Sequence, residues 1–265
     1  MRIVPLAELA SLVQQATAAS PQPRIVTSGN FASPIETLQA LVGQLESCRL
    51  HALNPQPGLP LHDGVVPETA FVGPGFRKNP SLSYVPARLS LVPRLFAGPL
   101  RPDVVVVHTT EPRNGKVSLG LEVNILPGAI EAARAAGALV VAQLNPRMPW
   151  TFGDAEVSVE DIDLGVEVDA PLATHVAPAP GDDAVEIGSR VAAEVGDGAA
   201  LQAGIGEVPD ATIARVGDRR NLRIWTEMFS DGVLALEHAG ALDRGVPITT
   251  SFIFGSAELY AWVND

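Results

Sequence analysis

Short runs of β-branched residues alternate along the chain with alanine-rich stretches that have an apolar face. The run "VVVVH" at residues 104–108 has no polar position between its valines, which is typical of a strand buried on both faces. Such an alternation of strands and helices predicts a mostly parallel sheet covered by helices. In the first two thirds of the chain the expected strands are Arg24–Thr27, Leu50–Leu53, Ala70–Val72, Val104–His108, Leu139–Leu144 and Leu164–Val168.

Two of the intervening helices carry clear end signals. The stretch "SPIETLQALVGQLES" offers Ser33 as an N-cap and Pro34 at the first helical position, where the missing N–H of proline costs nothing. The stretch "LPGAIEAARAAG" is expected to end at Gly137, because glycine accepts the left-handed conformation that closes many helices.

The pattern breaks at "PLATHVAPAPGDDA", which is rich in proline, alanine and acid and predicts a linker at 176–185. The predicted domains are therefore 1–175 and 186–265. The second opens with the helix "DAVEIGSRVAAEV" and then shows three strand–helix units, which start at "ALQAGIG", "LRIWTEM" and "PITTSFIFG". The fold class predicted is α/β, with two open domains of mostly parallel sheet and an incomplete second sheet.

Composition excludes several classes of protein. A chain of 265 residues with 46% hydrophobic residues can bury a large core, and its formal net charge of -12 argues against a non-specific nucleic-acid binder. The single cysteine, Cys48, excludes a disulfide framework and is typical of a reducing compartment. The five histidines show none of the close spacings that metal sites use, so no metal is expected.

The N-terminus does not have the order of a secretory signal, because "MRIVPLAELASLVQQATAAS" has one basic residue and carries Glu8 inside its apolar part. No apolar run reaches the ~20 residues that span a bilayer. The expectation is a cytoplasmic protein without a membrane partner.

Two features of the second domain lie at the ends of successive strands. Glu227 follows the apolar run Leu222–Trp225, where a carboxylate loses hydration unless something requires it. The alternative is a surface acid that caps the next helix, although Ser230 and Asp231 are already available as caps. In "GIGEVPDA", Gly204 and Gly206 end the preceding strand and let a backbone approach a ligand closely.

The glycine pair alone is a weak signal. Pro209 replaces the third glycine of a dinucleotide fingerprint and the lysine of a P-loop is absent, so a tight turn without a ligand remains open. Carboxyl ends of neighbouring parallel strands face a common crevice, so Gly204, Gly206 and Glu227 are expected in one pocket. A carboxylate that faces backbone donors is suited to attack on an acyl group.

The segments "LQAGIGEVPDATI", "IWTEMFSDGVLALEHAGAL", "SFIFGSAELYAWVND" and "NPRMPWTFGD" resemble the acetyl-CoA hydrolase/transferase family, which includes acetate and 4-hydroxybutyrate CoA-transferases. The T-E-M-x-S-D-G segment is the most specific part. The resemblance implies two domains of the CoA-transferase type and assigns the catalytic glutamate of the family to Glu227. It also implies that the family continues beyond Asp265, so the chain alone is expected to be weakly active and prone to associate.

The implied activity moves CoA between an acyl-CoA and a small carboxylic acid such as acetate, through a glutamyl-CoA thioester on Glu227. CoA is then a substrate and no permanently bound cofactor is expected; a homodimer is typical of the family. The alternatives are an acyl-CoA hydrolase, which differs in how well water is excluded, and a non-catalytic CoA-binding remnant. The residues expected to contact CoA or substrate are Gly204, Ile205 and Gly206, together with Gly73, Pro74 and Gly75 in "FVGPGFRK". Arg77 or Lys78 of the same segment would meet the phosphates of CoA; the alternative is a proline-glycine turn with two solvated cations.

Weaker candidates lie elsewhere in the first domain. "NPRMP" at 145–149 follows a buried strand and is either a substrate-positioning segment or a structural turn. "EPRNGKVSLG" predicts a hairpin, with Glu111, Asn114 and Ser118 near the pocket and Ser118 as a bonding partner for an acyl carboxylate.

Overall fold

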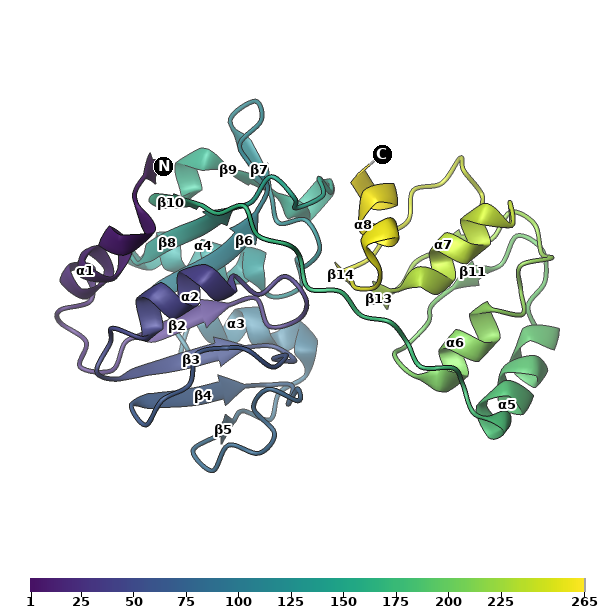
Figure 1. The fold of residues 1–265 in the computed structure, drawn as a ribbon, viewed down its shortest axis with the longest axis horizontal. Helices are drawn as coiled ribbons and strands as arrows, with labels where there is room; N and C mark the ends of the chain where they lie inside the picture. The colour runs from purple at the N-terminus through teal and green to yellow at the C-terminus, as the bar shows by residue number, and fades with distance from the viewer. Residues whose placement is uncertain (265) are drawn as a thin grey trace. The chain divides into compact units, whose positions relative to one another are not determined.

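The structure, a computed structural model, describes residues 1–264, and it divides into two compact units, Met1–Ala173 and Thr174–Asp265. Both units combine parallel strands with helices (Figure 1). The predicted α/β class with mostly parallel sheet is confirmed.

Unit 1 is built on an eight-stranded sheet with the strand order β1-β10-β8-β6-β2-β3-β4-β5, in which every neighbouring pair is parallel. An additional antiparallel pair joins β7 to β9. The strands are β1 (Arg2–Ile3), β2 (Arg24–Thr27), β3 (Cys48–Ala52), β4 (Val65–Thr69), β5 (Ser83–Tyr84), β6 (Val104–Thr109), β7 (Lys116–Ser118), β8 (Leu139–Leu144), β9 (Glu156–Ser158) and β10 (Leu164–Glu167).

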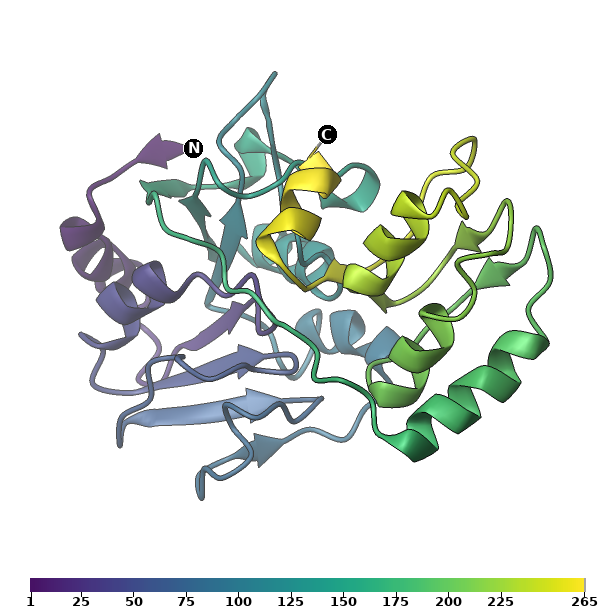
Figure 2. The same cartoon turned by 45° about the vertical axis from the view of Figure 1, so that its right-hand side comes forward.

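Helices cover both faces of this sheet, as parallel strands require. Helices α1 (Leu6–Ala16) and α2 (Ile35–Val42) lie on one face, and α3 (Val92–Phe96) and α4 (Leu126–Ala136) on the other (Figures 1 and 2). Alternate residues of each strand therefore enter two separate cores, with Val104 and Val106 in the core under α1 and α2 and Val105 and Val107 in the core under α3 and α4. Three short 3-10 turns complete the unit, at Leu89–Leu91, Gly153–Ala155 and Val159–Asp161.

The predicted elements of unit 1 need two corrections. The strand expected at Ala70–Val72 is wrong, because β4 occupies Val65–Thr69 and Ala70 follows its end. Ser33 is not the N-cap of α2: its hydroxyl donates to the carbonyls of Ser28 and Asn30 instead. Helix α4 does close as predicted, with Gly137 in the left-handed conformation.

A buried polar network lies at the carboxyl ends of β6 and β8. The Nε2 atom of His108 accepts from the side-chain amides of Asn145 at 3.0 Å and Gln143 at 3.3 Å. Both amides are oriented by backbone groups, since Gln143 Oε1 accepts from the N–H of Thr37 and Asn145 Oδ1 from that of Arg147. Nε2 therefore carries no proton and the imidazole is neutral. Burial lowers the pKa of His108 to about 4, against the opposing effect of the nearby backbone of Ala32 and Ser33.

Unit 2 contains three parallel strand segments. The first is β11 (Ala200–Leu201), which pairs with β12 (Arg223–Ile224) in the second segment. The second segment continues into β13 (Met228–Phe229), which pairs with β14 (Phe252–Ile253). Its helices are α5 (Asp182–Ala193), α6 (Glu207–Ile213), α7 (Asp231–His238) and α8 (Ala257–Asn264). Helices α5 and α6 pack so closely that a Cβ on Gly188 would lie 2.8 Å from Ala211.

Cys48 is fully buried in β3, where burial raises the pKa of its thiol to about 11. Across residues 1–264 no helix is both long and apolar enough to cross a membrane. The same part of the chain has no group of three or more histidine, cysteine, aspartate or glutamate side chains that could hold a metal ion.

Candidate active site

The strand that leads to Glu227 is tied to the strand that leads to the glycine turn. The hydroxyl of Thr226 accepts from the N–H of Ala203 at 3.1 Å and lies 2.9 Å from the carbonyl oxygen of Ala203. The register of β11 and β12 pairs Leu201 with Ile224 and ends there, and beyond it the Thr226 hydroxyl holds Ala203 beside Thr226. Gly204 and Glu227 therefore each follow one member of this bonded pair.

The glycine turn presents open backbone. Gly204, Ile205 and Gly206 are all exposed, and a Cβ placed on either glycine would meet no atom within 4 Å. Gly206 has φ of 132°, a conformation that side chains disfavour, and it precedes the first residue of α6. Helix α6 starts at Glu207, directly after this glycine.

Glu227 has a fixed backbone and a free side chain. Its carbonyl oxygen accepts from the N–H groups of Ser251 at 2.9 Å and Phe252 at 3.2 Å, and from the hydroxyl of Thr250 at 3.1 Å. The side chain is exposed. Its carboxylate makes no hydrogen bond or ion pair with any residue that the structure describes. A carboxylate held in place by its main chain, and engaged by nothing else, is available to a reactant.

The other residues of the T-E-M-x-S-D-G segment have structural partners. Met228 is buried, and Gly232 lies where a Cβ would come within 2.8 Å of Ile213. The carboxylate of Asp231 accepts from the N–H and the hydroxyl of Ser256. The capping expected of this segment is therefore only partly correct: Ser230 is the N-cap residue of α7 but its side chain makes no capping bond, and Asp231 bonds the start of α8 instead.

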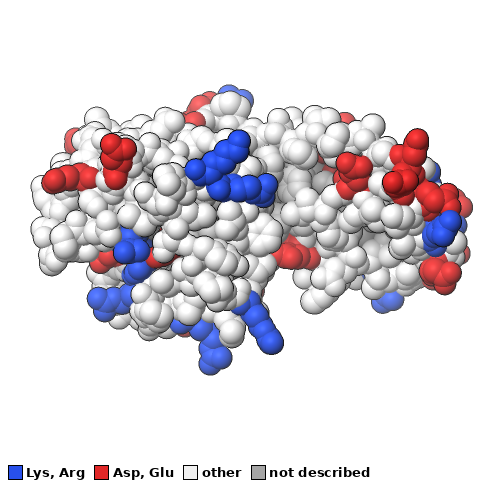
Figure 3. All heavy atoms as spheres, turned by 90° about the horizontal axis from the view of Figure 1, so that it is seen from below, with Lys and Arg blue, Asp and Glu red and all other residues white. Residues whose placement is uncertain are grey.

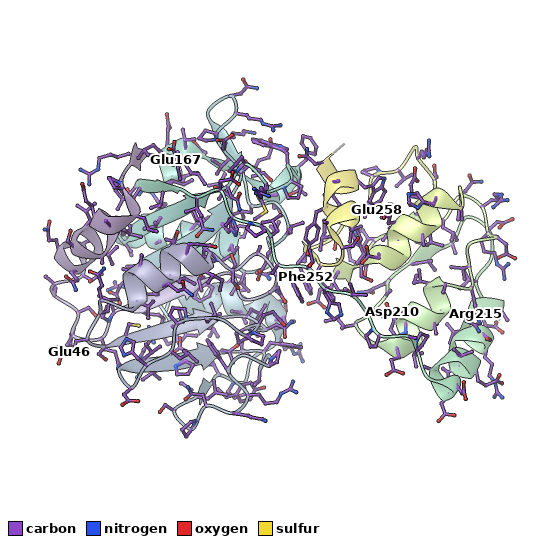
Figure 4. All side chains as sticks on the ribbon, in the orientation of Figure 1. Glu46, Glu167, Asp210, Arg215, Phe252 and Glu258 are labelled. Carbon is purple, nitrogen blue, oxygen red and sulfur yellow. The ribbon has the colours of Figure 1, made fainter. Side chains whose placement is uncertain are left out.

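A small hollow in unit 2 lies beside the glycine turn. Asp210, which lies on α6 (Figure 4), is one of its lining residues, and burial raises the pKa of this carboxyl against the opposing influence of His175. Gly206 and Glu227 do not line this hollow. Its lining residues are Ala203, Gly204, Asp210, Ile213, Met228, Phe229, Ser230, Gly232 and Val233.

The candidate residues of unit 1 differ in accessibility. Pro74 is exposed between Gly73, which is buried, and Gly75, which is half-buried. Ser118 is fully buried, and its hydroxyl donates to the carbonyl of Thr151 at 2.8 Å and accepts from the N–H of Gly120 at 3.1 Å. The predicted role of Ser118 toward an acyl carboxylate is therefore wrong, because its bonding capacity is used inside the fold.

Two other segments of unit 1 form turns. Residues 110–118 make a hairpin in which Arg113 bridges Lys116, and Asn114 has φ of 51° in its turn. Asn145 in "NPRMP" is buried and bonds His108 and the carbonyl of Ala170, so it favours the structural interpretation of that segment.

The surface carries an uneven distribution of charge. On the face drawn in Figure 3, acidic side chains gather over unit 2, and basic side chains occur in small separate groups without a continuous stripe. This face therefore offers no track for a nucleic-acid backbone.

Comparison with known proteins identifies relatives. Residues 67–177 match the sequence profile described as acetyl-CoA hydrolase/transferase N-terminal domain. The chain is 37% identical over 190 residues to the 4-hydroxybutyrate coenzyme A transferase of Clostridium kluyveri, and the alignment covers 69% of this chain and 43% of that protein. The chain thus spans less than half the length of this curated relative.

Solved structures with the same fold extend over the whole chain. The crystal structure of a 4-hydroxybutyrate CoA-transferase from Porphyromonas gingivalis matches with a TM-score of 0.76 and 27% identity, covering 100% of this chain and 65% of that chain. RipA from Yersinia pestis matches with a TM-score of 0.86 at 23% identity, covering 100% of this chain and 66% of that chain, which shows a shared fold.

Proposed function

The chain belongs to the acetyl-CoA hydrolase/transferase family, and on this premise we propose that it transfers CoA between an acyl-CoA and a small carboxylic acid, with Glu227 as the residue that carries CoA. The relative from Clostridium kluyveri is named 4-hydroxybutyrate coenzyme A transferase, and a relative from Fasciola hepatica is named succinyl-CoA:acetate/propanoyl-CoA:succinate CoA transferase. Acetate, or another small acid, serves as the acceptor.

The reaction uses the carboxylate of Glu227 as the nucleophile. It attacks the thioester carbonyl of acyl-CoA, so the C–S bond breaks and a mixed anhydride and CoA thiolate form. The thiolate then attacks the glutamyl carbonyl of the anhydride, which gives a glutamyl-CoA thioester and releases the acyl group as a carboxylate. The acceptor acid acquires CoA by the reverse steps, which return Glu227 to a free carboxylate. The energy of the thioester is retained first in the anhydride and then in the glutamyl-CoA thioester, so water must be kept away from both intermediates.

One observation supports this proposal most strongly. In the T-E-M-x-S-D-G segment, Thr226 and Asp231 bond to other parts of unit 2, whereas the exposed carboxylate of Glu227 has no partner among the described residues. Glu227 is exposed, so its carboxylate keeps its hydration, contrary to the expectation for this strand end, and it stays free to reach a reactant. The open backbone at Gly204–Gly206 lies at the end of the neighbouring strand, where it could accept a thioester carbonyl or the pantetheine arm.

The proposal is tested by incubating the protein with acetyl-CoA and a second acid, such as butyrate. Formation of butyryl-CoA that Glu227→Gln abolishes supports CoA transfer. Glu194→Gln is the matched control, because Glu194 is also an exposed glutamate of unit 2, and it should keep full activity. Release of free CoA at the same rate without butyrate would indicate a hydrolase. No reaction of acetyl-CoA, together with no binding, would contradict the proposal.

The remaining partners follow from the same reaction. Acyl-CoA and the carboxylic acid are substrates, and CoA is covalently bound only during turnover. The homodimer and the cytoplasmic location stay predictions, as do the contacts of CoA with Gly73, Pro74 and Gly75.

A further inference from the structure

Glu122 is a buried carboxylate that the proposed reaction does not use. It follows the β7 strand, lies 1% exposed, and is bonded on both oxygens. Its Oε1 accepts from the N–H of Gly29 at 3.1 Å and the side-chain amides of Asn30 and Asn124, both at 2.9 Å. Its Oε2 accepts from the N–H of Asn30 at 3.0 Å.

Every one of these partners is a donor, so the site is built for the ionised carboxylate. Burial raises the pKa of Glu122, and the bonds from Asn124, Gly29 and Asn30 oppose that effect. Gly29 and Asn30 follow the end of β2, which lies next to β6 in the sheet. The chain runs outward from β2 to β3 on one side and from β6 to β8 on the other, so this is the switch point of the sheet. At such a point the strand ends usually bind a ligand, whereas here the carboxylate of Glu122 accepts the hydrogen bonds of the donors at the end of β2.

The bonds continue from Asn30 toward the strand ends of β3 and β4, which lie side by side with β2 (Figure 2). The Oδ1 atom of Asn30 accepts from the side-chain amide of Asn54 at 2.7 Å. The N–H of Asn54 donates to the carbonyl of Phe71 at 2.9 Å. Asn54 has φ of 49°, a left-handed conformation that asparagine tolerates better than most residues. A continuous path of hydrogen bonds therefore runs from Glu122 to the segment 71–77.

Glycines mark the places where these segments touch. A Cβ on Gly29 would lie 2.0 Å from the carbonyl oxygen of Leu53, and a Cβ on Gly73 would lie 2.4 Å from the backbone of Asn54. A Cβ on Gly75 would lie 2.4 Å from the carbonyl oxygen of Gln56. The two glycines of "GPG" are thus required for packing on 54–56, and Pro74 between them remains exposed.

We propose that Glu122 is a positioning residue for acyl-CoA: through Asn30 and Asn54 it holds the backbone of 71–77 in the conformation that presents Pro74 and the following Arg77 and Lys78 to CoA. This inference rests on the proposed function, because it takes CoA as the ligand of that loop. Glu122 itself does not touch the substrate. A side-chain carboxylate at the switch point replaces an external anion, so the loop is already ordered before CoA arrives, which lowers the cost of binding.

The test compares Glu122→Gln with Glu131→Gln, an exposed glutamate on α4. The glutamine amide at 122 keeps the shape but directs an NH₂ group at donors. Hydrogen–deuterium exchange followed by mass spectrometry should show faster exchange of the amides of 28–33, 53–56 and 71–77 in Glu122→Gln, with β6 and β8 unchanged. Calorimetric titration with acetyl-CoA should show a dissociation constant raised about tenfold, equivalent to ~1.4 kcal/mol. Glu131→Gln should change neither quantity.

A second variant covers the case in which Glu122→Gln does not fold. Asn54→Gly keeps a residue that accepts the left-handed conformation and removes only the amide that bonds Asn30, so it should loosen 71–77 and weaken acetyl-CoA binding without loosening 28–33. Unchanged exchange at 71–77, or unchanged affinity, in the folded variants would overturn the inference. If the wild-type protein binds no acetyl-CoA, the proposed function fails, while the exchange comparison still decides whether Glu122 holds this loop.

Discussion

The hydroxyl of Thr226 bonds the N–H of Ala203 and lies within bonding distance of its carbonyl, so the residue before Glu227 is clamped to the residue before Gly204. Thr226 is 6% exposed, and its hydroxyl also lies 3.0 Å from the carbonyl of Met228. The clamp joins two strand ends where no regular strand pairing continues. It explains why a threonine precedes the glutamate.

Replacing Thr226 by valine should separate the two strand ends. The variant keeps the shape of the side chain but leaves the Ala203 N–H without a partner, which costs about 1 to 3 kcal/mol of stability. CoA transfer should slow roughly ten- to hundredfold, because even a small displacement of the nucleophile from the reacting carbonyl lowers the rate of attack. Thr226→Ser retains the hydroxyl and should keep most of the activity. Equal activity of the valine and serine variants, measured at a temperature where both are folded, would show that the clamp is unimportant.

The glycine turn should respond differently at its two glycines. At Gly204 a side chain would enter open space, so Gly204→Val should change stability by no more than about 0.5 kcal/mol. It should still reduce acyl-CoA turnover at least roughly tenfold, because the side chain fills the space next to the backbone where acyl-CoA is expected to bind. Gly196→Val is the matched control, since Gly196 also faces open space in unit 2. At Gly206 any side chain is strained at φ of 132°, so Gly206→Val should cost about 1 to 3 kcal/mol as well. Unchanged kinetics of Gly204→Val would show that acyl-CoA does not bind against the backbone at Gly204.

His108 should make stability fall in mild acid. In the unfolded chain the pKa of this imidazole has its usual value near 6.5, whereas in the folded chain burial lowers the pKa to about 4. The contribution of the neutral imidazole to stability is therefore fully present above pH 6.5 and decreases as the pH falls toward 4. Below pH 4 this group lowers the stability no further. The loss between pH 7 and pH 5 should be about 2 kcal/mol. Urea unfolding at both values should show a smaller difference in His108→Gln; an equal difference would contradict the neutral assignment.

Glu68 should stabilise unit 1 at neutral pH, whereas an exposed acid should contribute almost nothing. It accepts from Arg24 Nε at 2.9 Å and bonds His51 Nδ1 at 3.0 Å inside unit 1. Burial raises its pKa, but the bonds and charges of His51 and Arg24 outweigh burial and leave the pKa below its usual value. This stabilisation is present above the pKa of Glu68 in the unfolded chain, near 4.5, and is lost as the pH falls through its lower pKa in the folded chain.

At pH 7 the variant Glu68→Gln should therefore lose about 3 to 5 kcal/mol, because it leaves Arg24 with no carboxylate beside it. Glu46→Gln, at an exposed position (Figure 4), should lose almost nothing. Equal unfolding midpoints in guanidinium chloride for these two variants would show that the buried ion pair does not stabilise unit 1.

The sequence predicts most accurately the strands that are buried on both faces. The bounds of β2 and β8 match the expected runs, since short runs rich in apolar and β-branched residues need no distant partner to be recognised as strands. Strand β4 could not be recognised in this way, because Pro67 and Glu68 interrupt it. Its acid is tolerated only because Arg24 and His51 lie on neighbouring strands, a pairing that no local pattern shows.

The expected single pocket of Gly204, Gly206 and Glu227 stays a prediction, because of these three only Gly204 lines the hollow in unit 2; what the sequence could show is the placement of the residues at strand ends. Glu227 and Gly204 each follow an apolar run, and a parallel register brings such ends together. Thr226 was missed because its partner Ala203 is a backbone group 23 residues away. Glu122 was missed because "LGLEVN" contains no companion charge. The signal that could have found it is the pair of asparagines, Asn30 and Asn54, that follow successive strands.

The central claim is that Glu227 carries CoA as a thioester, and trapping that thioester tests it most directly. The protein is incubated with acetyl-CoA, treated with borohydride, which reduces a thioester to an alcohol, and digested for mass spectrometry. The account predicts that the peptide containing Glu227 carries CoA before reduction and a three-carbon side chain ending in a hydroxyl at 227 after it, and that neither product forms in Glu227→Gln. Detection of the adduct on another residue, or turnover of acetyl-CoA with Glu227 unmodified throughout, would contradict the account.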